Sequence, residues 1–277
     1  MDFIEWFFKE TGRTPEGLFS FAHLFSVTLG LAIFLGLAVL LAKIVKTDEK
    51  KQTKVLIGAG IGIVVVFIIK MTYIILTSLD SPIGDVIVGN LPLYLCDMQI
   101  FVIPLAALTK GRFRKSCLDF VAIWGLLMGF FGTYFAGNIY GSHCAFSFFA
   151  IIGLLEHTIS AFAALFIFLC GLNTMEYKNM PFSVGILVIY MTTALVIDYA
   201  DNHNFMFFFH GDGTPFDFFR NLVNDIKPLY QLEIYILQCG YMVGFYFAYH
   251  GIVKWINNAK KKKEMEKANT EIVKEGE

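Results

Sequence analysis

Charged residues are scarce in this chain. They make up 16% of its 277 residues, whereas hydrophobic residues make up 56% and the mean hydropathy is +0.62. A soluble domain carries about 25% charged residues. The composition therefore excludes an ordinary soluble domain and indicates an integral membrane protein. The formal net charge of −1 indicates no class of partner, and we expect no nucleic-acid partner.

Several familiar signals are missing as well. The five cysteines include no CxxC pair, and the six histidines show no HxxxH or HxxEH spacing, so the sequence predicts mostly free thiols and no metal site. The first residues, MDFIEWFFKETGRTPEGLF, are too mixed in charge for a cleavable signal peptide. We interpret residues 1–18 as an amphipathic segment at the membrane interface, anchored by Trp6, Phe7 and Phe8.

Long apolar stretches dominate the rest of the chain. A transmembrane helix needs roughly 20 apolar residues, and the sequence contains seven candidates. It therefore predicts an all-α polytopic membrane protein, with about seven transmembrane helices in residues 19–256 and a Lys-rich cytoplasmic tail at 257–277. The predicted spans are 19–42, 55–79, 91–109, 117–136, 145–172, 182–199 and 229–255.

The placement of Lys and Arg predicts the orientation, because cytoplasmic loops carry an excess of both. Segments 43–54 and 110–115 are basic, as is the tail, whereas 80–90 and 137–143 contain no Lys or Arg. With seven spans, every basic segment falls on one side of the membrane. We therefore expect the N-terminus outside and the C-terminus in the cytoplasm.

Two pairs of small residues predict places where helices approach closely. Gly58 and Gly62 form one pair, and Gly125 and Gly129 form the other, with Gly132 following. Such spacing lets helix backbones pack against each other in membranes. We interpret both pairs as structural and assign them no function.

Polar side chains interrupt the apolar stretches, although they are costly in lipid and usually face the interior of a bundle. In the predicted topology nearly all of them lie in the outer half of the membrane. The cytoplasmic half offers only Asp119, which can snorkel, and His250. This one-sidedness predicts one polar cavity opening toward the outer leaflet. The candidate site residues are Lys70, Cys96, Asp97, Gln99, Glu156, His157, Asn202 and Asn204.

Cys96 and His157 have the chemistry of a nucleophile and its base. Asn90 and Pro92 predict a helix start that places Cys96 in the second turn, where the helix dipole modestly favours a thiolate. A neutral imidazole takes the thiol proton and returns it to a leaving group. Asp97 next to the thiol works against the thiolate.

Structural interpretations compete with this chemistry. A single membrane cysteine is most often a small buried hydrophobic residue. An ion pair of Lys70 with Glu156 or Asp97 would explain those charges without a reaction. Asn202 and Asn204 would serve equally well as caps of the sixth helix, and His143 and His203 as exposed loop residues.

Three motifs occur in a fixed order: LPLYLCDMQ, LLEHTISAF and DYADNHNFMFF. With these motifs the chain resembles the YwaF-like integral membrane family, which is related to the vertebrate transmembrane acyltransferase that remodels ether phospholipids. The resemblance covers residues 90–255. Two features depart from the family pattern. Phe205 stands in place of Tyr after the Asn motif, and loop 207–228 is long, which we interpret as a lid or a path for lipid.

The resemblance implies an acyl-transfer site. Cys96 matches the nucleophile and His157 the histidine, while Asn202 and Asn204 match the Asn motif and would orient a head group or donate to an oxyanion. The implied reaction forms a thioester on Cys96 from a membrane phospholipid, then passes the acyl chain to a lysolipid. With water as acceptor the protein would be a lipid hydrolase. No soluble cofactor is needed, and the compact chain suggests a bacterial cytoplasmic membrane protein.

Two other functions stay open. A transporter or channel for a small polar solute would use Lys70, Asp97, Glu156 and His157 as a binding site or proton relay. A non-catalytic lipid-binding or accessory subunit would need neither Cys96 nor His157. Replacing Cys96 separates these alternatives from a thioester enzyme. Under the acyl-transfer interpretation, the supporting residues are Lys70, Asp97, Gln99, Glu156, Asn202 and Asn204.

Overall fold

The computed structural model describes residues 2–9, 12–45, 47–211 and 216–275, with side chains up to residue 261. All the regular elements in this part of the chain are helices. The predicted all-α class is therefore confirmed.

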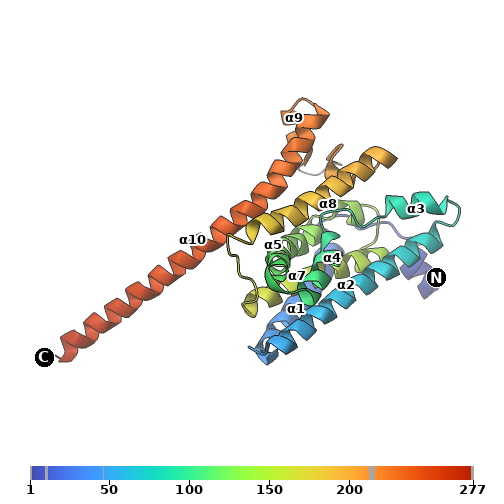
Figure 1. Ribbon diagram of the computed structural model, residues 1–277. Coiled ribbons are helices and arrows are strands. Elements are labelled where there is room, and N and C mark those ends of the chain that lie inside the picture. Colours follow the sequence, from blue (N-terminus) through green and yellow to red (C-terminus); the bar gives the residue numbers. More distant parts are fainter. Residues whose placement is uncertain (1, 10–11, 46, 212–215, 276–277) are drawn as a thin grey trace.

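The bundle is built around two central helices. α5 (Gly111–Tyr134) and α7 (Phe148–Leu169) pack against each other more extensively than any other pair. α1 (Phe21–Val45) and α2 (Glu49–Thr77) form a hairpin along one side of them (Figure 1). α8 (Met180–Asp201) and α10 (Lys227–Glu275) lie on the other side, and α10 projects far beyond the bundle.

Glycines explain the close contact at the centre. A Cβ added at Gly125 would lie 2.6 Å from the Ser160 carbonyl oxygen, and one at Gly129 would lie 2.4 Å from the Ala161 Cβ. No residue larger than glycine fits at this separation of the helices. The prediction that Gly125 and Gly129 bring two helices together is confirmed.

The other glycine pair does not pack in this way. A Cβ added at Gly58 meets no atom within 4 Å, and one at Gly62 meets only Ile159 Cδ1, at 3.8 Å. No helix backbone approaches α2 at these two positions. The prediction that Gly58 and Gly62 form a packing pair is wrong.

Among the residues that the structure describes, five segments are long and apolar enough to cross a membrane: Phe21–Val45, Glu49–Thr77, Gly111–Tyr140, Phe148–Leu169 and Met180–Asp201. The predicted third span contains only an 11-residue helix, α4 (Met98–Leu108). The predicted seventh span lies in α10, whose polar Gln231, Glu233 and Gln238 lower its hydropathy. The structure thus shows a polytopic helical membrane protein, while the count of seven spans stays a prediction.

The start of the third predicted span is not helical. Asn90 caps the C-terminus of the short helix α3 (Ile83–Gly89), with its backbone N–H bonded to Ile87. Residues 90–97 form turns and bends, and α4 begins at Met98. The expected helix start at Asn90 is therefore wrong. Proline disfavours helical geometry in the residue before it, and Pro92 lies in this irregular loop.

Short elements complete the fold. The N-terminal π-helix η1 (Glu5–Lys9) packs on α2 and α7, where the rings of Phe8 and Phe148 lie 4.9 Å apart. Tyr73 donates a 2.5 Å hydrogen bond to the Phe8 carbonyl oxygen. The remaining short helices are α6 (Gly137–Tyr140), η2 (Phe205–Phe207) and α9 (Phe216–Leu222). Residues 212–215 of the expected lid loop lie outside the described residues.

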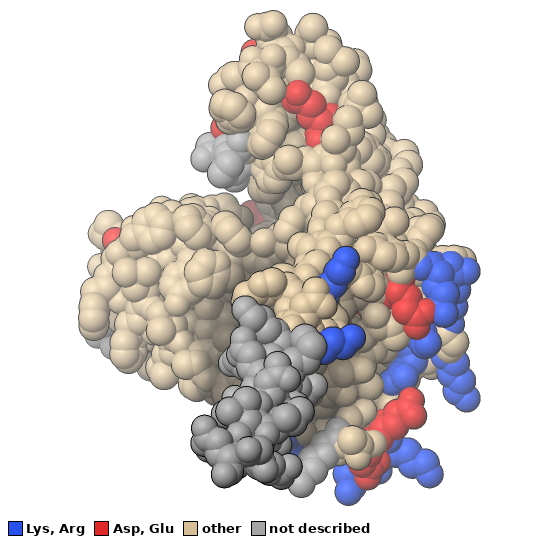
Figure 2. Space-filling model, turned by 90° about the vertical axis from the view of Figure 1, so that its left-hand side faces the viewer, with Lys and Arg blue, Asp and Glu red and all other residues tan. Residues whose placement is uncertain are grey.

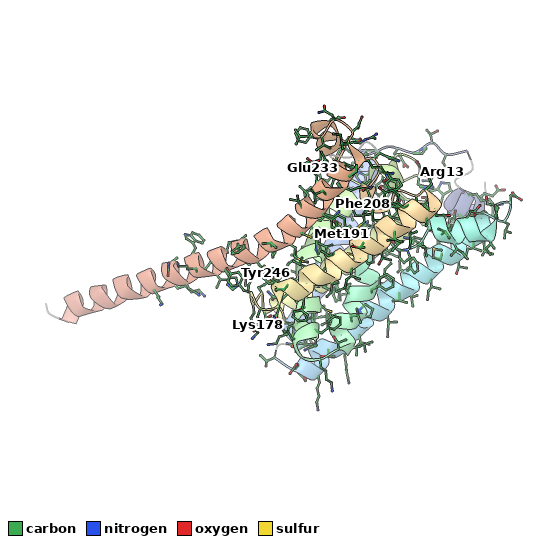
Figure 3. The ribbon with its side chains drawn as sticks, turned by 45° about the horizontal axis from the view of Figure 1, so that its top comes forward. Arg13, Lys178, Met191, Phe208, Glu233 and Tyr246 are labelled. Carbon is green, nitrogen blue, oxygen red and sulfur yellow. The ribbon has the colours of Figure 1, made fainter. Side chains whose placement is uncertain are left out.

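A buried seam joins α8 to α10. Met191, Phe208 and Tyr246 are fully buried along it (Figure 3). The Ser183 hydroxyl lies 3.0 Å from the Tyr246 hydroxyl and links the two helices. This seam holds the first part of α10, as far as Tyr246, against the bundle.

Charged side chains are concentrated on one part of the surface. Figure 2 shows Lys and Arg side chains concentrated over one part of this face, with Asp and Glu among them, while most of the surface carries no charge. Many large apolar side chains are exposed, including Ile33 at 57% and Ile189 at 71%. An exposed apolar surface of this extent suits contact with lipid.

Candidate functional site at the start of α4

Three charged side chains meet between α2, α7 and the start of α4. The Lys70 Nζ lies 2.8 Å from the Glu156 Oε2 and 3.9 Å from the Asp97 Oδ1. The three side chains are between 9% and 18% exposed. Charges this far from water persist only when they are paired. Both of the ion pairs considered from the sequence are therefore present, and they share one lysine.

Cys96 lies at this cluster. Its Sγ is 3.9 Å from the Asp97 Oδ1, and the thiol is free and partly buried. The side chain precedes α4 instead of lying in its second turn. Asp97 stands at the N-cap position, but its carboxylate accepts from the Tyr94 N–H at 3.2 Å and makes no cap to the helix. The N-terminus of α4 therefore has no side-chain cap, and the Gln99 and Ile100 N–H groups donate to the backbone carbonyl oxygens of Cys96 and Asp97.

Tyr190 of α8, which sequence reasoning missed, holds the loop that carries Cys96. Its hydroxyl donates to the carbonyl oxygen of Pro92 and lies 3.4 Å from that of Tyr94. A tyrosine within an apolar helix carries no sequence signal that marks such a contact. Its position fixes the loop against α8.

The first and third motifs of the resemblance contact each other at this loop. The ring of Tyr94 packs 5.3 Å from Phe205, so LPLYLCDMQ meets NHNF in space. Asn204 accepts from the Phe209 N–H at 2.8 Å and donates to the His210 carbonyl at 2.8 Å. Asn204 thus organises residues 204–210. Asn202 is the C-cap of α8 in a left-handed conformation with φ of 52°.

Two histidines expected to be exposed are half-buried. His203 lies 2.8 Å from the Asp201 carboxylate, and a Cβ added at Gly89 would lie 3.2 Å from the His203 ring. The ring of His143 packs 4.4 Å from Phe149. Both lie in loops, as expected, but they are only partly exposed because neighbouring segments cover one side of each ring.

His157 follows Glu156 on α7, but its ring faces α5. A Cβ added at Gly132 would lie 2.3 Å from the His157 Cε1, so the ring occupies the space that this glycine leaves. Within the described residues, no hydrogen bond joins His157 to Cys96. The structure therefore brings Cys96, Asp97 and Lys70 together. It places the His157 imidazole apart from the thiol, in the α5–α7 interface.

Buried polar atoms without a partner occur on Glu156 in the cluster and on Gln99, two residues after Asp97 in the chain. Gln99 is completely buried, and neither its amide nitrogen nor its amide oxygen has a hydrogen-bond partner. The Glu156 Oε1 has none either. Buried polar atoms without partners are uncommon and costly, so these atoms are suited to a polar ligand. The described part of the chain contains no group of three or more His, Cys, Asp or Glu that could hold a metal ion.

A second buried polar centre surrounds Asp119, which was expected to snorkel toward water. That expectation is wrong, because Asp119 is completely buried. Its carboxylate accepts from the backbone N–H groups of Thr174 and Met175 at 2.8 and 3.0 Å, and from the Tyr246 hydroxyl at 3.0 Å. The α7–α8 loop thereby wraps around one carboxylate. The prediction that polar groups favour one side does not account for this centre.

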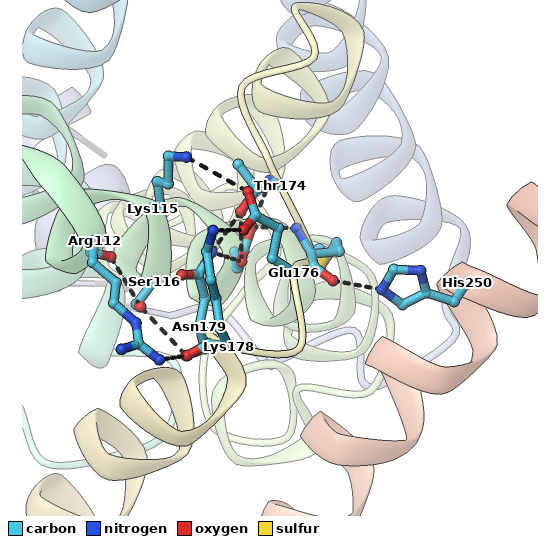
Figure 4. A network of polar contacts seen from close by, with 10 residues as sticks. Arg112, Lys115, Ser116, Thr174, Glu176, Lys178, Asn179 and His250 are labelled. Carbon is cyan, nitrogen blue, oxygen red and sulfur yellow. Dashed lines mark hydrogen bonds and ion pairs between the residues drawn. The ribbon is translucent and has the colours of Figure 1, made fainter.

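The same network reaches the surface (Figure 4). His250 lies 2.7 Å from the Met175 carbonyl oxygen, and Lys115 pairs with Glu176 at 3.5 Å. A hydrogen bond from Lys178 lowers the pKa of Glu176. These contacts brace the loop, and we assign them no catalytic role.

Two apolar grooves flank α2. One of about 340 Å³ lies between α1, α2 and α7, and one of about 210 Å³ lies between α2 and α4. Both run alongside the helix that carries Lys70. Their linings begin some residues away from the charged cluster and contain none of its side chains.

Comparison with known proteins identifies a family. The model of the TMEM164 family matches residues 18–256, which is nearly the whole chain. No curated protein and no solved structure matches the chain. The family match supports the integral membrane class.

Proposed function

The chain belongs to the TMEM164 family of membrane proteins, and from this premise we propose that it is a membrane-embedded acyltransferase. It moves a fatty-acyl chain between membrane lipids through a thioester on Cys96, with His157 as general base. A phospholipid is the donor and a lysolipid the acceptor, so no soluble cofactor takes part.

One observation supports this proposal above the others: a free thiol lies just before the N-terminus of α4, within a charged cluster enclosed by apolar helices. The helix N-terminus favours the thiolate, which is the reactive form, whereas the Asp97 carboxylate 3.9 Å from the sulfur opposes it. Surroundings with little water favour transfer to a lipid hydroxyl over hydrolysis.

The proposed reaction has two balanced halves. The Cys96 proton passes to His157, and the thiolate sulfur attacks the ester carbonyl carbon. The ester C–O bond breaks, and the departing lysolipid oxygen takes the proton back from His157. In the second half, an acceptor hydroxyl gives its proton to His157 and its oxygen attacks the thioester. The C–S bond breaks and the thiol is restored.

The surrounding residues have supporting roles. Lys70 and the Gln99 amide donate to the ester or oxyanion oxygen, while Asp97 and Glu156 hold the Lys70 ammonium. Asn202 and Asn204 shape the segment that packs on the Cys96 loop. Because the His157 ring rests on Gly132, its approach to the thiol requires movement on substrate binding. Catalytic hydrogen bonds are often long in ligand-free structures and tighten in the complex.

The orientation that suits this reaction has seven spans, with the N-terminus outside and the C-terminus in the cytoplasm. The 11 residues of α4 and the non-helical segment before it then form the third crossing. The site lies in the outer half of a bacterial cytoplasmic membrane. Membrane phospholipids and lysolipids are its partners.

The intact mass of the purified protein tests the proposal. After incubation with mixed phospholipids, we expect a fatty-acyl mass shift that neutral hydroxylamine removes. Cys96→Ser should lack the adduct or carry only a hydroxylamine-resistant ester, and His157→Ala should form it more slowly. Cys239→Ser, which changes a thiol on α10, is the matched control and should retain it. Absence of any adduct in the wild type would contradict the proposal.

The ion pairs favour one alternative function. Lys70 shared between Glu156 and Asp97 is an arrangement that a transporter or channel for a small polar solute would also use. A transporter should keep full uptake in Cys96→Ser, since the thiol plays no part in it. Loss of lipid acyl exchange in the same variant would instead support the thioester enzyme.

A further inference from the structure

The groove between α1, α2 and α7 is hollow for a specific reason. Its wall on α2 contains Gly58 and Gly62, whose missing side chains leave the space open. Protein interiors are normally close-packed, and glycines in membrane helices normally bring helices together. Here they create a groove of about 340 Å³ instead.

The groove is apolar throughout. Leu37 and Leu41 line it from α1, Val55 from α2, and Ile159 and Phe162 from α7. All three helices belong to the segments that are long and apolar enough to cross a membrane. The surroundings that such a groove faces are lipid chains.

One end of the groove approaches the charged cluster. Gly62 faces Ile159 across the groove, and Glu156 precedes Ile159 by about one helical turn, roughly 4.5 Å along α7. Lys70 follows Gly62 by roughly 12 Å along α2. Side chains lean toward the N-terminus of their helix, so Lys70 leans back toward Gly62, whereas Glu156 leans away from Ile159. The Lys70–Glu156 pair, 2.8 Å apart, therefore lies more than one helical turn beyond this end of the groove.

We infer that the groove between α1, α2 and α7 binds the fatty-acyl chain of a membrane lipid, with the ester end of the lipid at Lys70 and Glu156. The two ends of the site match the two parts of such a ligand. The apolar groove accepts the chain, and the Lys70 ammonium donates hydrogen bonds to the ester and head-group oxygens. The fate of the bound chain rests on the proposed acyl transfer, whereas its binding does not.

A groove of fixed length is also expected to select acyl chains by their length. A chain that lies along α2 reaches from the ion pair toward Leu41 and Val55, so filling the groove midway shortens the chain that fits. Gly58→Leu and Gly62→Leu add a side chain where the glycines leave space. Gly185→Leu on α8 adds the same side chain where a Cβ also meets no atom within 4 Å, away from the groove, and is the matched control.

Photo-crosslinking tests the binding directly. The purified protein is reconstituted with a phosphatidylcholine that carries a diazirine at the end of one long acyl chain, and labelled peptides are mapped by mass spectrometry. We expect labelling concentrated near Leu41 and Val55. Gly58→Leu and Gly62→Leu should reduce it severalfold while Gly185→Leu leaves it unchanged. An octanoyl version of the probe should bind all three variants alike.

Two results test lipid binding in the groove independently of the proposed acyl transfer. Cys96→Ser should keep the labelling, because the thiol is not needed for binding. Concentrated labelling without any thioester would uphold the groove and overturn the acyl transfer. Uniform labelling of α1, α2 and α8 that Gly58→Leu and Gly62→Leu do not change would mean annular lipid only and would overturn the inference. Unchanged thermal unfolding of the variants in detergent shows that they are folded.

Discussion

Lys70 shows how a single residue can be retained in an apolar helix. Its ammonium is shared by Glu156 and Asp97, so one positive charge faces two carboxylates. Asp119 is stabilised differently, by neutral donors from the α7–α8 loop and α10. Both centres contain a buried polar atom without a partner, the Asn179 Oδ1 at Asp119 and the Glu156 Oε1 at Lys70. The Lys70 cluster adds an ion pair and a free thiol on Cys96, which makes it the better candidate for the proposed reaction.

At the residue scale, we predict that Lys70→Met destabilises the protein by about 3–5 kcal/mol, because it leaves two buried carboxylates without a counter-charge. Adding Glu156→Gln to that variant should recover part of the loss, since one unpaired charge disappears. Reversible unfolding in mixed detergent micelles measures each variant in a double-mutant cycle. Independent, additive effects of the two substitutions would show that the side chains do not form a pair.

At the scale of elements, glycine has two opposite uses in this fold. On α5, Gly125, Gly129 and Gly132 let α7 and the His157 ring come close. On α2, no neighbouring backbone fills the space at Gly58 and Gly62, and a groove is left. The spacing of the glycines is the same in both pairs. Only the approach of the second helix distinguishes a packing surface from a hollow.

The α5–α7 contact gives the prediction at this scale. Gly129→Leu should destabilise the protein by about 1–3 kcal/mol, because overpacking forces the two helices apart. Its Cβ alone would meet the Ala161 Cβ at 2.4 Å. Gly185→Leu, in open space on α8, should be neutral or slightly stabilising, since leucine has the higher helix propensity. Thermal unfolding in detergent compares the two, and equal stability would contradict the packing argument.

The whole molecule has one end rich in basic side chains and an elongated C-terminal helix. Lys and Arg gather over one part of the face in Figure 2, and α10 extends past the bundle in Figure 1. A charged end and an otherwise apolar surface are what a protein needs to take one orientation in a membrane. In the predicted orientation the proposed site lies nearer the outer face, and the Leu41 and Val55 end of the groove lies nearer the cytoplasmic face.

At this scale, we predict that the α1–α2 loop is cytoplasmic and the α2–α3 loop is outside. In a cysteine-free background, Lys50→Cys should react with a membrane-impermeant maleimide only after the cells are permeabilised. Asp80→Cys should react in intact cells, and both residues are exposed. The reverse pattern would invert the orientation, and labelling of both from one side would show that α2 does not cross.

Composition and the lengths of the apolar stretches were enough to predict the class, the all-α fold and five of the candidate spans, because lipid forces apolar residues into long hydrogen-bonded helices. The sequence also placed Lys70, Cys96, Asp97 and Glu156 among the candidate residues. These side chains could be found without the structure, because a charge or thiol within an apolar stretch stands out locally.

The contacts between helices were decided by the tertiary structure. It moved the start of the third predicted helix from Asn90 to Met98, because Tyr190 holds the intervening loop in an irregular conformation. It turned the His157 ring toward Gly132, buried Asp119 under the α7–α8 loop, and opened a groove at Gly58 and Gly62. Each outcome depends on a partner far away in the chain. The local pattern shows that a polar residue or a glycine is present, but only packing determines what it faces.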